Sequence, residues 1–532
     1  MLLALSLIPP LIKIAPRWNF VDAPGERKVH TKCIPRIGGL AIVTGTLVPM
    51  LIWLPAQPTS VSLILSIVVL LIFGVWDDRK NLHYKTKFAG QFLAAVIVVV
   101  FADVRIHWLP FLSQPLAEPI ACLFTIVVVV AITNALNLVD GLDGLAGGTT
   151  LLGFMLLALL AYLAHDDTVV IMCLGITGAT LGFLRFNTHP ANIFMGDTGS
   201  QFLGFGASIV SIRLTQQADI KLSPLLPLIL LGIPIFDTMA VMLRRMARGA
   251  SPFSPDRNHI HHRLLDMGFD HYEVVVILYV LQGFLSVAAF LLRYADDIIL
   301  AVFIAVVFGA IFGSLHLGDR YPGRFRREKT PSTSPDKHLG YRFHPNLYVA
   351  IKCLLALTPS TIIVLSGYYS NTPSLDLGVL TWAISLLFFI TSLRKAQPHL
   401  LHIEHIAQYI LCSISAFLLY KIAANTDAYY IRLLAAYLFA FTCFLLIFPP
   451  PSSAKFELTP LDYLVMLVAA FLAELPVENL QLQILALCLS CLIMLLYITE
   501  FVIANEVFPT RKLRIGTLLT ACGLAASLFV RT

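Results

Sequence analysis

Charged residues are scarce in this chain. Only 13% of its 532 residues are Asp, Glu, Lys or Arg, whereas 58% are hydrophobic, which is more apolar side chain than a soluble core needs. A soluble globular fold is therefore excluded. Apolar runs of roughly 17 to 24 residues recur along the whole sequence, and each can cross about 30 Å of hydrocarbon as a helix. The sequence predicts an all-α polytopic membrane protein, with about 11 core helices and about 7 more towards the C-terminus.

The sequence also lacks the cysteine patterns of disulfide and zinc proteins. Its nine cysteines are scattered, mostly inside apolar runs. The C-x-x-C pair, Cys488 and Cys491, has no second pair beside it and falls in a predicted membrane helix. The N-terminal apolar stretch lacks a basic region and a small-residue cleavage site, so it predicts a short first membrane helix rather than a signal peptide.

Lys and Arg are concentrated in the odd-numbered loops between the predicted helices. Such residues near membrane ends mark the cytoplasmic side, so the odd loops are predicted to be cytoplasmic. The net charge of +6 is then a sign of topology, and no nucleic-acid partner is expected. These basic residues are Arg17, Arg27, Lys28, Lys32 and Arg36 in loop 1, Arg79, Lys80, Lys85 and Lys87 in loop 3, and Arg244, Arg245, Arg248, Arg257 and Arg263 in loop 9.

A long, basic segment rich in Pro and Ser divides the chain into two membrane regions. The predicted domains are a membrane core over residues 1–316, a cytoplasmic linker over 317–345, and an additional transmembrane segment over 346–532. No sequence repeat relates the two membrane regions. The additional segment has few charges inside its apolar runs, so packing, partner docking or lipid guiding is expected of it rather than a second active site.

Asp77 and Asp78 directly follow the apolar run "SIVVLLIFGVW". They therefore lie at the C-terminal end of a predicted helix, where the helix dipole disfavours carboxylates. A cation should offset them. A divalent metal is one candidate, and a solvated loop with Arg79, Lys80, Lys85 and Lys87 is the other, which is favoured when these residues are taken alone.

The stretch "NALNLVDGLDGLAGG" ends another apolar run. Asn134, Asn137 and Asp140 are spaced by three and share one helical face, and Asp143 follows Gly141. A polar stripe inside lipid must face protein or water. A capped helix end would explain part of this pattern, but the number of polar groups favours a ligand site.

Two further motifs carry oxygen and nitrogen donors. In "FMGDTGS", Asp197 is either a helix cap or an oxygen ligand for magnesium, with glycines that let the backbone approach a phosphate. In "HIHH", residues 259–262, the flanking Arg257 and Arg263 favour phosphate binding, although a zinc site stays open.

All these motifs fall in odd loops of the first half of the chain. Carboxylates suited to magnesium, basic residues suited to phosphates and glycine-rich turns at one membrane face are typical of phosphoryl transfer between a soluble anionic donor and a lipid. The predicted cofactor is Mg²⁺, with Mn²⁺ as the alternative. Composition alone names no substrate.

Residues 1 to about 315 resemble the polyprenyl-phosphate N-acetylhexosamine-1-phosphate transferases, the family that includes WecA, TagO and MraY. The resemblance lies in five motifs in the family's order: "DAPGERKVH" with "PRIGG", "DDRKN", "NALNLVDGLDGLAGG", "NIFMGDTGSQFLG" and "PDRNHIHHRLLDMGF". It implies transfer of a sugar 1-phosphate from a UDP-sugar to undecaprenyl phosphate at the cytoplasmic face of the bacterial inner membrane. The products would be UMP and a lipid-linked sugar that starts cell-surface polysaccharide synthesis.

The resemblance also implies roles for individual positions. Asp77, Asp78 and Asp197 match the family's catalytic carboxylates, with Asp78 and Asp197 expected to bind the metal and Asp77 matching the proposed base. The expected substrate-binding residues are Lys87, Asn134, Asn137, Asp140, Asp143, Phe194, Arg257, His259, His261, His262 and Arg263. Of these, Phe194 matches an aromatic position that packs on the uracil ring.

The family resemblance also implies a sugar donor and binding partners. The "HIHHR" motif is the version seen in WecA- and TagO-like members, which favours UDP-GlcNAc over other UDP-HexNAc donors and over the UDP-muramoyl-pentapeptide of MraY-like enzymes. Undecaprenyl phosphate and the bilayer are the other expected partners, and a homodimer and downstream glycosyltransferases stay open. A transporter is the alternative from another class, but it should carry charges at the bilayer midplane and often an internal repeat.

Overall fold

A computed structural model describes residues 1–22, 33–216, 222–249, 251, 258–320, 410–420, 434, 438, 459–473 and 480–504. The chain forms two compact units, one of residues 1–330 with 459–461 and the other of residues 331–458 with 462–532. Arg257 and most of the apolar runs predicted beyond residue 345 lie outside the described residues. The predicted domain boundaries at 316 and 346 stay predictions.

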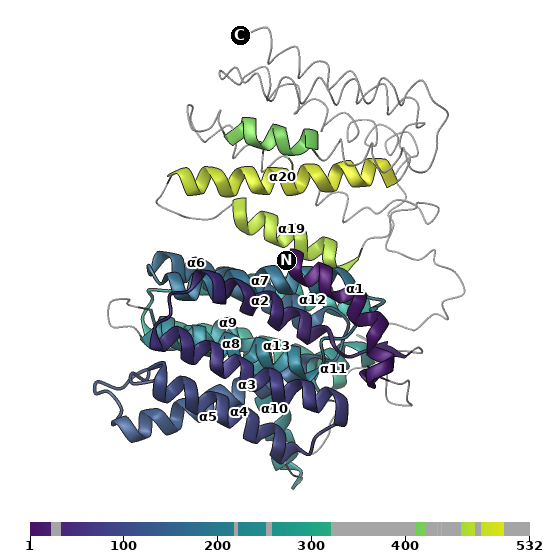
Figure 1. The fold of residues 1–532 in the computed structure, drawn as a ribbon. Helices are drawn as coiled ribbons and strands as arrows, with labels where there is room; N and C mark the ends of the chain where they lie inside the picture. The colour runs from purple at the N-terminus through teal and green to yellow at the C-terminus, as the bar shows by residue number, and fades with distance from the viewer. Residues whose placement is uncertain are drawn as a thin grey trace, which may run out of the picture. The chain divides into compact units, whose positions relative to one another are not determined.

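The first unit is a bundle of helices (Figure 1). Its helices are α1 (Leu2–Ile14), the short 3₁₀ helix η1 (Ala15–Trp18), α2 (Gly38–Trp53), α3 (Pro58–Lys80), α4 (Tyr84–Phe101), α5 (Glu118–Val139), α6 (Leu145–Leu163), α7 (Asp167–Asn187), α8 (Gly196–Gln216), α9 (Leu226–Leu230), α10 (Gly232–Ala247), α11 (Ile260–Asp266), α12 (His271–Leu291) and α13 (Asp297–Arg320).

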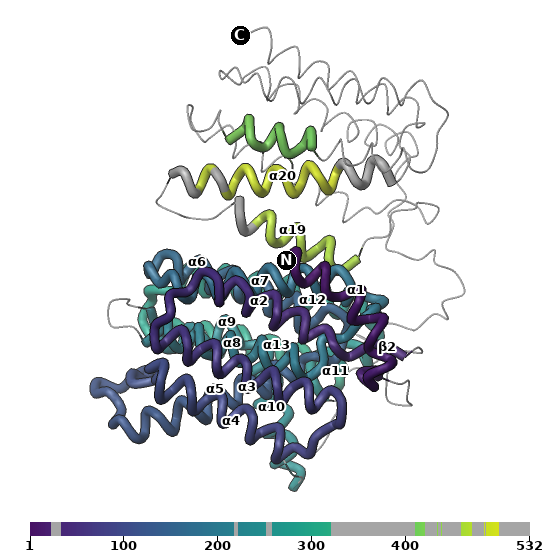
Figure 2. Tube along the Cα trace, viewed as in Figure 1, coloured from purple at the N-terminus to yellow at the C-terminus, as the bar shows by residue number. Residues whose placement is uncertain are grey.

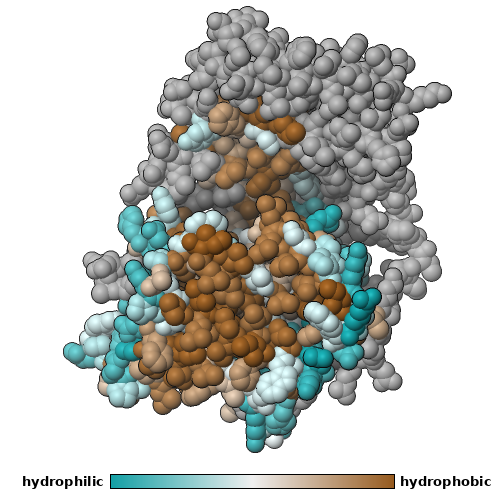
Figure 3. All heavy atoms as spheres, viewed as in Figure 1, coloured by the Kyte–Doolittle hydropathy of each residue, from teal (hydrophilic) through white to brown (hydrophobic). Residues whose placement is uncertain are grey.

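The predicted all-α membrane fold is confirmed. Among the described residues, seven helices are long and apolar enough to cross a membrane: α3, α4, α5, α6, α7, α12 and α13. Figure 3 shows the surface that corresponds to this, a broad hydrophobic band with hydrophilic residues gathered along two opposite edges. In the described part of the second unit, α19 (Pro460–Ala473) and α20 (Leu480–Ala504) coincide with two predicted apolar runs.

A small two-stranded antiparallel sheet is the one sheet among the described residues. Strand β1 (Val21–Asp22) pairs with β2 (Ile34–Pro35). The backbone N–H of Arg36 donates to the carbonyl oxygen of Phe20 at 2.9 Å, which extends the pairing. The sheet lies at the end of the bundle near the C-terminus of α1 (Figure 2).

The centre of the first unit is formed by α6 and α8. Nearly every residue of α8 is buried, and it packs against α2, α3, α5 and α6. Small residues allow these close approaches: a Cβ on Gly74 of α3 would lie 2.7 Å from the Cα of Thr198, and one on Gly39 of α2 would overlap the backbone of Gly199. Close packing of this kind is typical of helices in membranes. It fixes the start of α8 between the ends of α2 and α3.

The contact at Gly39 predicts a stability effect. We expect Gly39→Ala to lower the apparent melting temperature of the detergent-solubilised protein, because the added methyl group must push backbone against backbone and overpacking costs about 1–3 kcal/mol. Gly309→Ala is the control, since nothing lies within 4 Å of a Cβ at that helical glycine of α13. Equal melting temperatures for the two variants would contradict the packing described here.

Candidate active site

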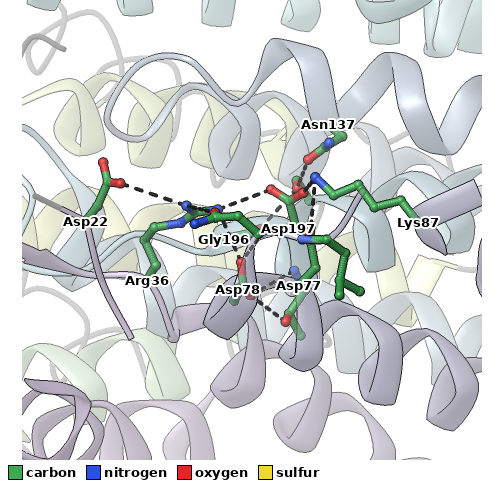
Figure 4. A network of polar contacts seen from close by, with 12 residues as sticks. Asp22, Arg36, Asp77, Asp78, Lys87, Asn137, Gly196 and Asp197 are labelled. Carbon is green, nitrogen blue, oxygen red and sulfur yellow. Dashed lines mark hydrogen bonds and ion pairs between the residues drawn. The ribbon is translucent and has the colours of Figure 1, made fainter. Parts of the chain in front are cut away.

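Three carboxylates meet where the ends of α3, α4 and α8 converge (Figure 4). Asp77 and Asp78 stand on the inner face of α3 with Gly74, and both are buried, at 2% and 6% exposure. Asp197 lies in the first turn of α8. Because α3 and α8 pack closely through Gly74 and Thr198, the two aspartates of α3 are brought against the beginning of α8.

Asp78 binds the N-terminus of α8. Its Oδ1 accepts the backbone N–H of Asp197 at 2.7 Å, and its Oδ2 accepts the backbone N–H and the hydroxyl of Thr198 at 3.1 and 2.6 Å. Unpaired amides and the helix dipole favour an anion at this position. The dipole of α3 disfavours the Asp78 carboxylate at the C-terminal end of that helix, and the hydrogen bonds from the N-terminus of α8 offset this cost.

Asp77 is held on both oxygens. Its Oδ1 accepts the backbone N–H of Leu82 at 2.7 Å, which fastens the turn after α3. Its Oδ2 lies 2.7 Å from Nζ of Lys87 in α4, and Lys87 also forms an ion pair with Oδ2 of Asp197. Lys87 is therefore the one of the four predicted cations that this structure places between the carboxylates.

Arg36 is the second cation of the site. Its Nη2 lies 3.5 Å from Oδ1 of Asp78 and 3.5 Å from Oδ1 of Asp197, and its Nη1 lies 3.8 Å from Oδ1 of Asp22. Burial alone would lower the pKa of Arg36, but these carboxylates raise it above its ordinary value. The guanidinium therefore stays charged and partly neutralises three acids.

The backbone connects loop 1 to loop 7, which is the loop between α7 and α8. The N–H of Phe194 donates to the carbonyl oxygen of Pro35 at 2.7 Å, and the N–H of Gly38 donates to the carbonyl oxygen of Phe194 at 2.9 Å. This parallel bridge fixes Arg36 opposite Phe194. These backbone hydrogen bonds thus hold Arg36 close to the start of α8.

The end of α5 and the loop between α5 and α6 supply the next group of polar residues. Asn137 of α5 accepts a hydrogen bond from the hydroxyl of Ser200 in α8 at 2.5 Å, and Asn134 lies half-buried one turn earlier. Asn187 of α7 accepts the N–H of Gly144 at 2.9 Å and donates to the carbonyl oxygen of Ile193 at 2.8 Å. Asn187 therefore fixes this loop against loop 7.

Asp140 and Asp143 differ in their surroundings. Burial, followed by the negative charge of Asp197, raises the pKa of Asp140 to about 7. Burial would also raise the pKa of Asp143, but hydrogen bonding to the ring of His189 holds it below its ordinary value, with the two atoms 2.7 Å apart. The negative charge of the carboxylate centre thus acts on Asp140, whereas Asp143 is paired with His189.

Histidines border the same loop. His189 stacks on His271 at 4.2 Å between ring centroids, and ligand atoms of these two rings and of Asp143 all lie within 4.8 Å of one another, a set that could hold a metal ion. The ring of His261 lies against Gly141, where a Cβ would meet its Nε2 at 2.5 Å. Burial, with the neighbouring His262 and His259, lowers the pKa of His261, so its ring is neutral at pH 7.

Asp237 of α10 positions the histidine motif. Its Oδ2 lies 2.9 Å from Nδ1 of His259, and its Oδ1 accepts the backbone N–H of Ile260 at 2.9 Å. This carboxylate is buried at 2% exposure and orients the His259 ring through Nδ1, as carboxylates commonly do for functional histidines. Arg263, in contrast, is buried in an ion pair with Asp319 of α13.

The donor set of the carboxylate centre suits magnesium. Oδ2 of Asp77 and Oδ2 of Asp197 are buried, and both are paired with the Lys87 ammonium, so they converge on one cationic position. Carboxylate oxygens are the ligands that Mg²⁺ prefers. Both oxygens of Asp78, by comparison, are already engaged by the start of α8.

Comparison with known proteins identifies the family of this chain. Residues 60–215 match the family model described as glycosyl transferase family 4. A probable undecaprenyl-phosphate N-acetylglucosaminyl 1-phosphate transferase of Bacillus subtilis is 36% identical over 327 residues, which are 59% of this chain and 89% of that protein. The chain belongs to this family.

Two other relatives agree with the assignment. An undecaprenyl-phosphate alpha-N-acetylglucosaminyl 1-phosphate transferase of Escherichia coli O157:H7 is 30% identical over 53% of this chain and 79% of its own length. A decaprenyl-phosphate N-acetylglucosaminephosphotransferase of Mycobacterium leprae is 34% identical over 52% and 77%. The family model ends at residue 215, so the histidine motif lies beyond it.

The sequence patterns predict no site role for several residues that the structure places here. Arg36 is predicted only as a topology signal, although it lies inside the "PRIGG" motif. His271 and His189 were given no role. Asp237, in "GIPIFDTMA", is an ionisable residue inside an apolar run, and such a residue is by itself a sign of function. The signal for Asp237 was therefore present in the sequence, whereas its partner His259 was visible only in the fold.

The raised pKa of Asp140 predicts a pH effect on stability in the absence of donor and divalent metal. The unfolded carboxyl has a pKa of about 3.9 and the folded one about 7, so between these values the folded state holds more protons. Stability contributed by this group therefore falls as pH rises through that window. We expect Asp140→Asn to raise the apparent melting temperature relative to wild type at pH 8, and the difference to narrow towards pH 5.

Asp103→Asn is the control for this measurement, because the Asp103 side chain is 80% exposed. Its melting-temperature difference from wild type should be the same at both pH values. A difference for Asp140→Asn that is independent of pH, or that grows as pH falls, would contradict the electrostatic description of this loop.

Proposed function

We propose that this family member transfers GlcNAc-1-phosphate from UDP-GlcNAc to undecaprenyl phosphate, with release of UMP. The observation that carries the proposal is the convergence of Asp77, Asp78 and Asp197 with Lys87 and Arg36 at the helix ends. The relatives, which are named as polyprenyl-phosphate GlcNAc-1-phosphate transferases, indicate the substrates.

The chemistry required of the protein is mainly positioning and neutralisation of charge. A phosphate monoester has a second pKa near 6, so the lipid phosphate is largely dianionic at pH 7 and needs little help from a base. Phosphoryl transfer is then accelerated by alignment and by fixed positive charge. Lys87 and Arg36 supply that charge.

Magnesium is proposed as the cofactor, held by Asp197 and Asp77. These two carboxylates direct buried Oδ2 atoms at the same point. The ion would neutralise the diphosphate of the donor and the leaving UMP. Asp78, predicted as a metal ligand, is better placed to hold the start of α8 and, through it, the carboxylate of Asp197.

The donor is proposed to lie over the loop between α5 and α6. Asn137, Asp140 and Asp143 present polar groups there, and Phe194 lies half-buried on the neighbouring loop 7. His259, His261 and His262 lie beside this loop and are the candidates for phosphate contacts. Arg263 would act on this region indirectly, because its guanidinium is paired with Asp319.

The active site is proposed to face the cytoplasm from the plasma membrane. Loops 1 and 3 meet at this site with the loop between α5 and α6 and the loop between α7 and α8. Loops 1 and 3 are rich in Lys and Arg, and such loops stay on the cytoplasmic side. UDP-sugars are charged and water-soluble, so a donor site on that side is consistent with the proposed reaction. The lipid product would serve further sugar transfer towards a surface polysaccharide.

A transfer assay tests the function. Membranes containing the protein would be incubated with labelled UDP-GlcNAc, undecaprenyl phosphate and Mg²⁺, and lipid-extractable label and UMP would be measured. We expect Asp197→Asn to reduce turnover at least 100-fold, because Asp197 is a proposed ligand of the metal ion, and losing one group that stabilises transition-state charge typically costs about that much. Chelation of divalent metal should abolish transfer, and added Mg²⁺ should restore it.

Asp103→Asn is again the matched control, since it removes an exposed carboxylate away from the site, and it should keep wild-type turnover. Parallel reactions with other UDP-HexNAc donors and with UDP-muramoyl-pentapeptide identify the donor. A wild-type protein that labels lipid from none of these donors would overturn the proposed function.

A further inference from the structure

Three potential metal ligands come together where two loops meet the start of α12. They are Asp143, in the loop between α5 and α6, His189, in the loop between α7 and α8, and His271, the first residue of α12. One ligand atom of each lies within 4.8 Å of the other two. The carboxylate centre around Lys87 shares none of these three residues.

The elements that carry the three side chains are fastened to one another. The hydroxyl of Tyr279 in α12 donates to the carbonyl oxygen of Gly144 at 2.7 Å, directly after Asp143 in the chain. The side chain of Asn187, two residues before His189, accepts the backbone N–H of the same Gly144 at 2.9 Å. A ligand set that the fold already holds together loses little conformational freedom when it binds, and this favours binding.

His271 is the residue whose surroundings indicate a ligand. Both of its ring nitrogens are buried, and neither has a hydrogen-bond partner of normal geometry among the described residues. Buried polar atoms in native proteins are nearly always paired with protein groups, water or an ion. The ring stacks on His189 at 4.2 Å between centroids, so its unpaired nitrogens lie close to those of a second imidazole.

Asp143 has the contacts of an ionised carboxylate. Its Oδ2 lies 2.7 Å from Nδ1 of His189 and accepts the backbone N–H of Ala191 at 3.1 Å. Burial alone would raise the pKa of Asp143, but these contacts hold it below its ordinary value. A hydrogen-bonded pair of one aspartate and one histidine would explain Asp143 and His189 without a metal. It would leave the two buried nitrogens of His271 unexplained.

Two imidazoles and one carboxylate select a different ion from the carboxylate centre. Imidazole suits Zn²⁺ and its neighbours in the first transition series, whereas Mg²⁺ prefers ligands that are all oxygen. Bonds of about 2.0–2.1 Å place the ligand atoms of a tetrahedral zinc site roughly 3.3 Å apart. The separations here range from 2.7 Å, between Asp143 and His189, to at most 4.8 Å, and so include this value.

We propose that Asp143, His189 and His271 bind a divalent transition-metal ion of the zinc class, and that the bound ion opposes binding of the sugar-nucleotide donor. Such ions require deprotonated ligands, so the proton between Asp143 and His189 is released to solvent when the ion binds. The effect on the donor rests on the proposed function, in which Asp143 belongs to the loop that holds the donor. An ion on this carboxylate takes a group that the donor would contact.

Metal retention tests the site directly. The full chain, purified without a polyhistidine tag and stripped with EDTA, would be dialysed against Zn²⁺ in the presence of excess Mg²⁺, and its zinc content measured. His271→Phe keeps a ring that can stack on His189 but removes both nitrogens. We expect it to bind this zinc ion at least tenfold more weakly than wild type, since even changes behind the ligands cost about 10–100-fold.

His316→Phe is the matched control for zinc retention. His316 is an exposed histidine of α13 and is not one of the three ligands. Its substitution should leave the zinc content equal to that of wild type. Size-exclusion profiles and melting temperatures of the two variants show whether each is folded.

Oxidation by bound copper locates the site in the wild-type protein and does not depend on a variant. Cu²⁺ binds nitrogen ligands more tightly than Zn²⁺ does, and with ascorbate and oxygen it oxidises the histidines that hold it. We expect oxidised His189 and His271 in the mapped peptides of the full chain in nanodiscs, with His316 unmodified. Excess Zn²⁺ should suppress this oxidation, and excess Mg²⁺ should not.

Kinetics test the effect on the donor. With Mg²⁺ in excess, we expect Zn²⁺ to raise the apparent KM of wild type for UDP-GlcNAc while kcat stays within twofold. His271→Phe should need at least tenfold more Zn²⁺ for the same proportional rise, and His316→Phe should respond as wild type does.

Equal zinc retention by wild type and His271→Phe, or oxidation confined to other histidines, would overturn the metal site. Zinc inhibition at the same concentration in wild type and His271→Phe would overturn its effect on the donor. Failure of the proposed function looks different. Wild type would then transfer no sugar phosphate from any donor, whereas zinc retention and copper oxidation would still report the three ligands.

Discussion

The hydrogen bonds between the carboxylate of Asp78 and the first amides of α8 are the interaction on which the rest of the site depends. They join two helices that are more than 100 residues apart in the sequence, and they set the position of Asp197, which is itself one of the donors. The close packing of Gly74 against Thr198 and of Gly39 against Gly199 makes this contact possible. A carboxylate that is unfavourable at the end of its own helix becomes favourable at the start of another, because the two helix dipoles have opposite effects on it.

Once Asp78 is fixed, the site has an excess of negative charge that the fold must balance. Asp77 and Asp197 face each other across Lys87, and Arg36 approaches Asp78 and Asp197 from the other side. The two cations thus lie beside three carboxylates, and Asp140 is close enough to be affected by the same negative charge. Under the proposed function, this surplus of acidic groups is the electrostatic reason why a divalent cation would suit the centre.

Much of the organisation could be predicted from the chain. The apolar runs gave the helices, the distribution of Lys and Arg gave the polarity of the loops, and five ordered motifs gave the family. The polar residues of loops 1, 3, 5 and 7 were expected at one face, and the structure brings residues of all four together. What the sequence could not supply was the pairing: Lys87 rather than Lys85 between the acids, Arg36 as the second cation, and Asp237 behind His259. Pairing depends on how helices rotate and approach one another, and local sequence does not encode that.

The sequence by itself therefore determined that the protein lies in a lipid bilayer, that its fold is helical, and which family it belongs to. Unpaired backbone polar groups are costly in hydrocarbon, so few folds other than a helical one are open to a chain so poor in charge. Only the tertiary structure decided what each polar residue does. The neighbours of Arg263 in the chain predict a phosphate ligand, whereas in the fold its guanidinium forms an ion pair with Asp319. Asp77 and Asp78 are adjacent in sequence, yet one faces a lysine and the other a helix terminus. The physical reason is that partners in a buried polar site are chosen by distances of a few ångströms between elements that are remote in the chain.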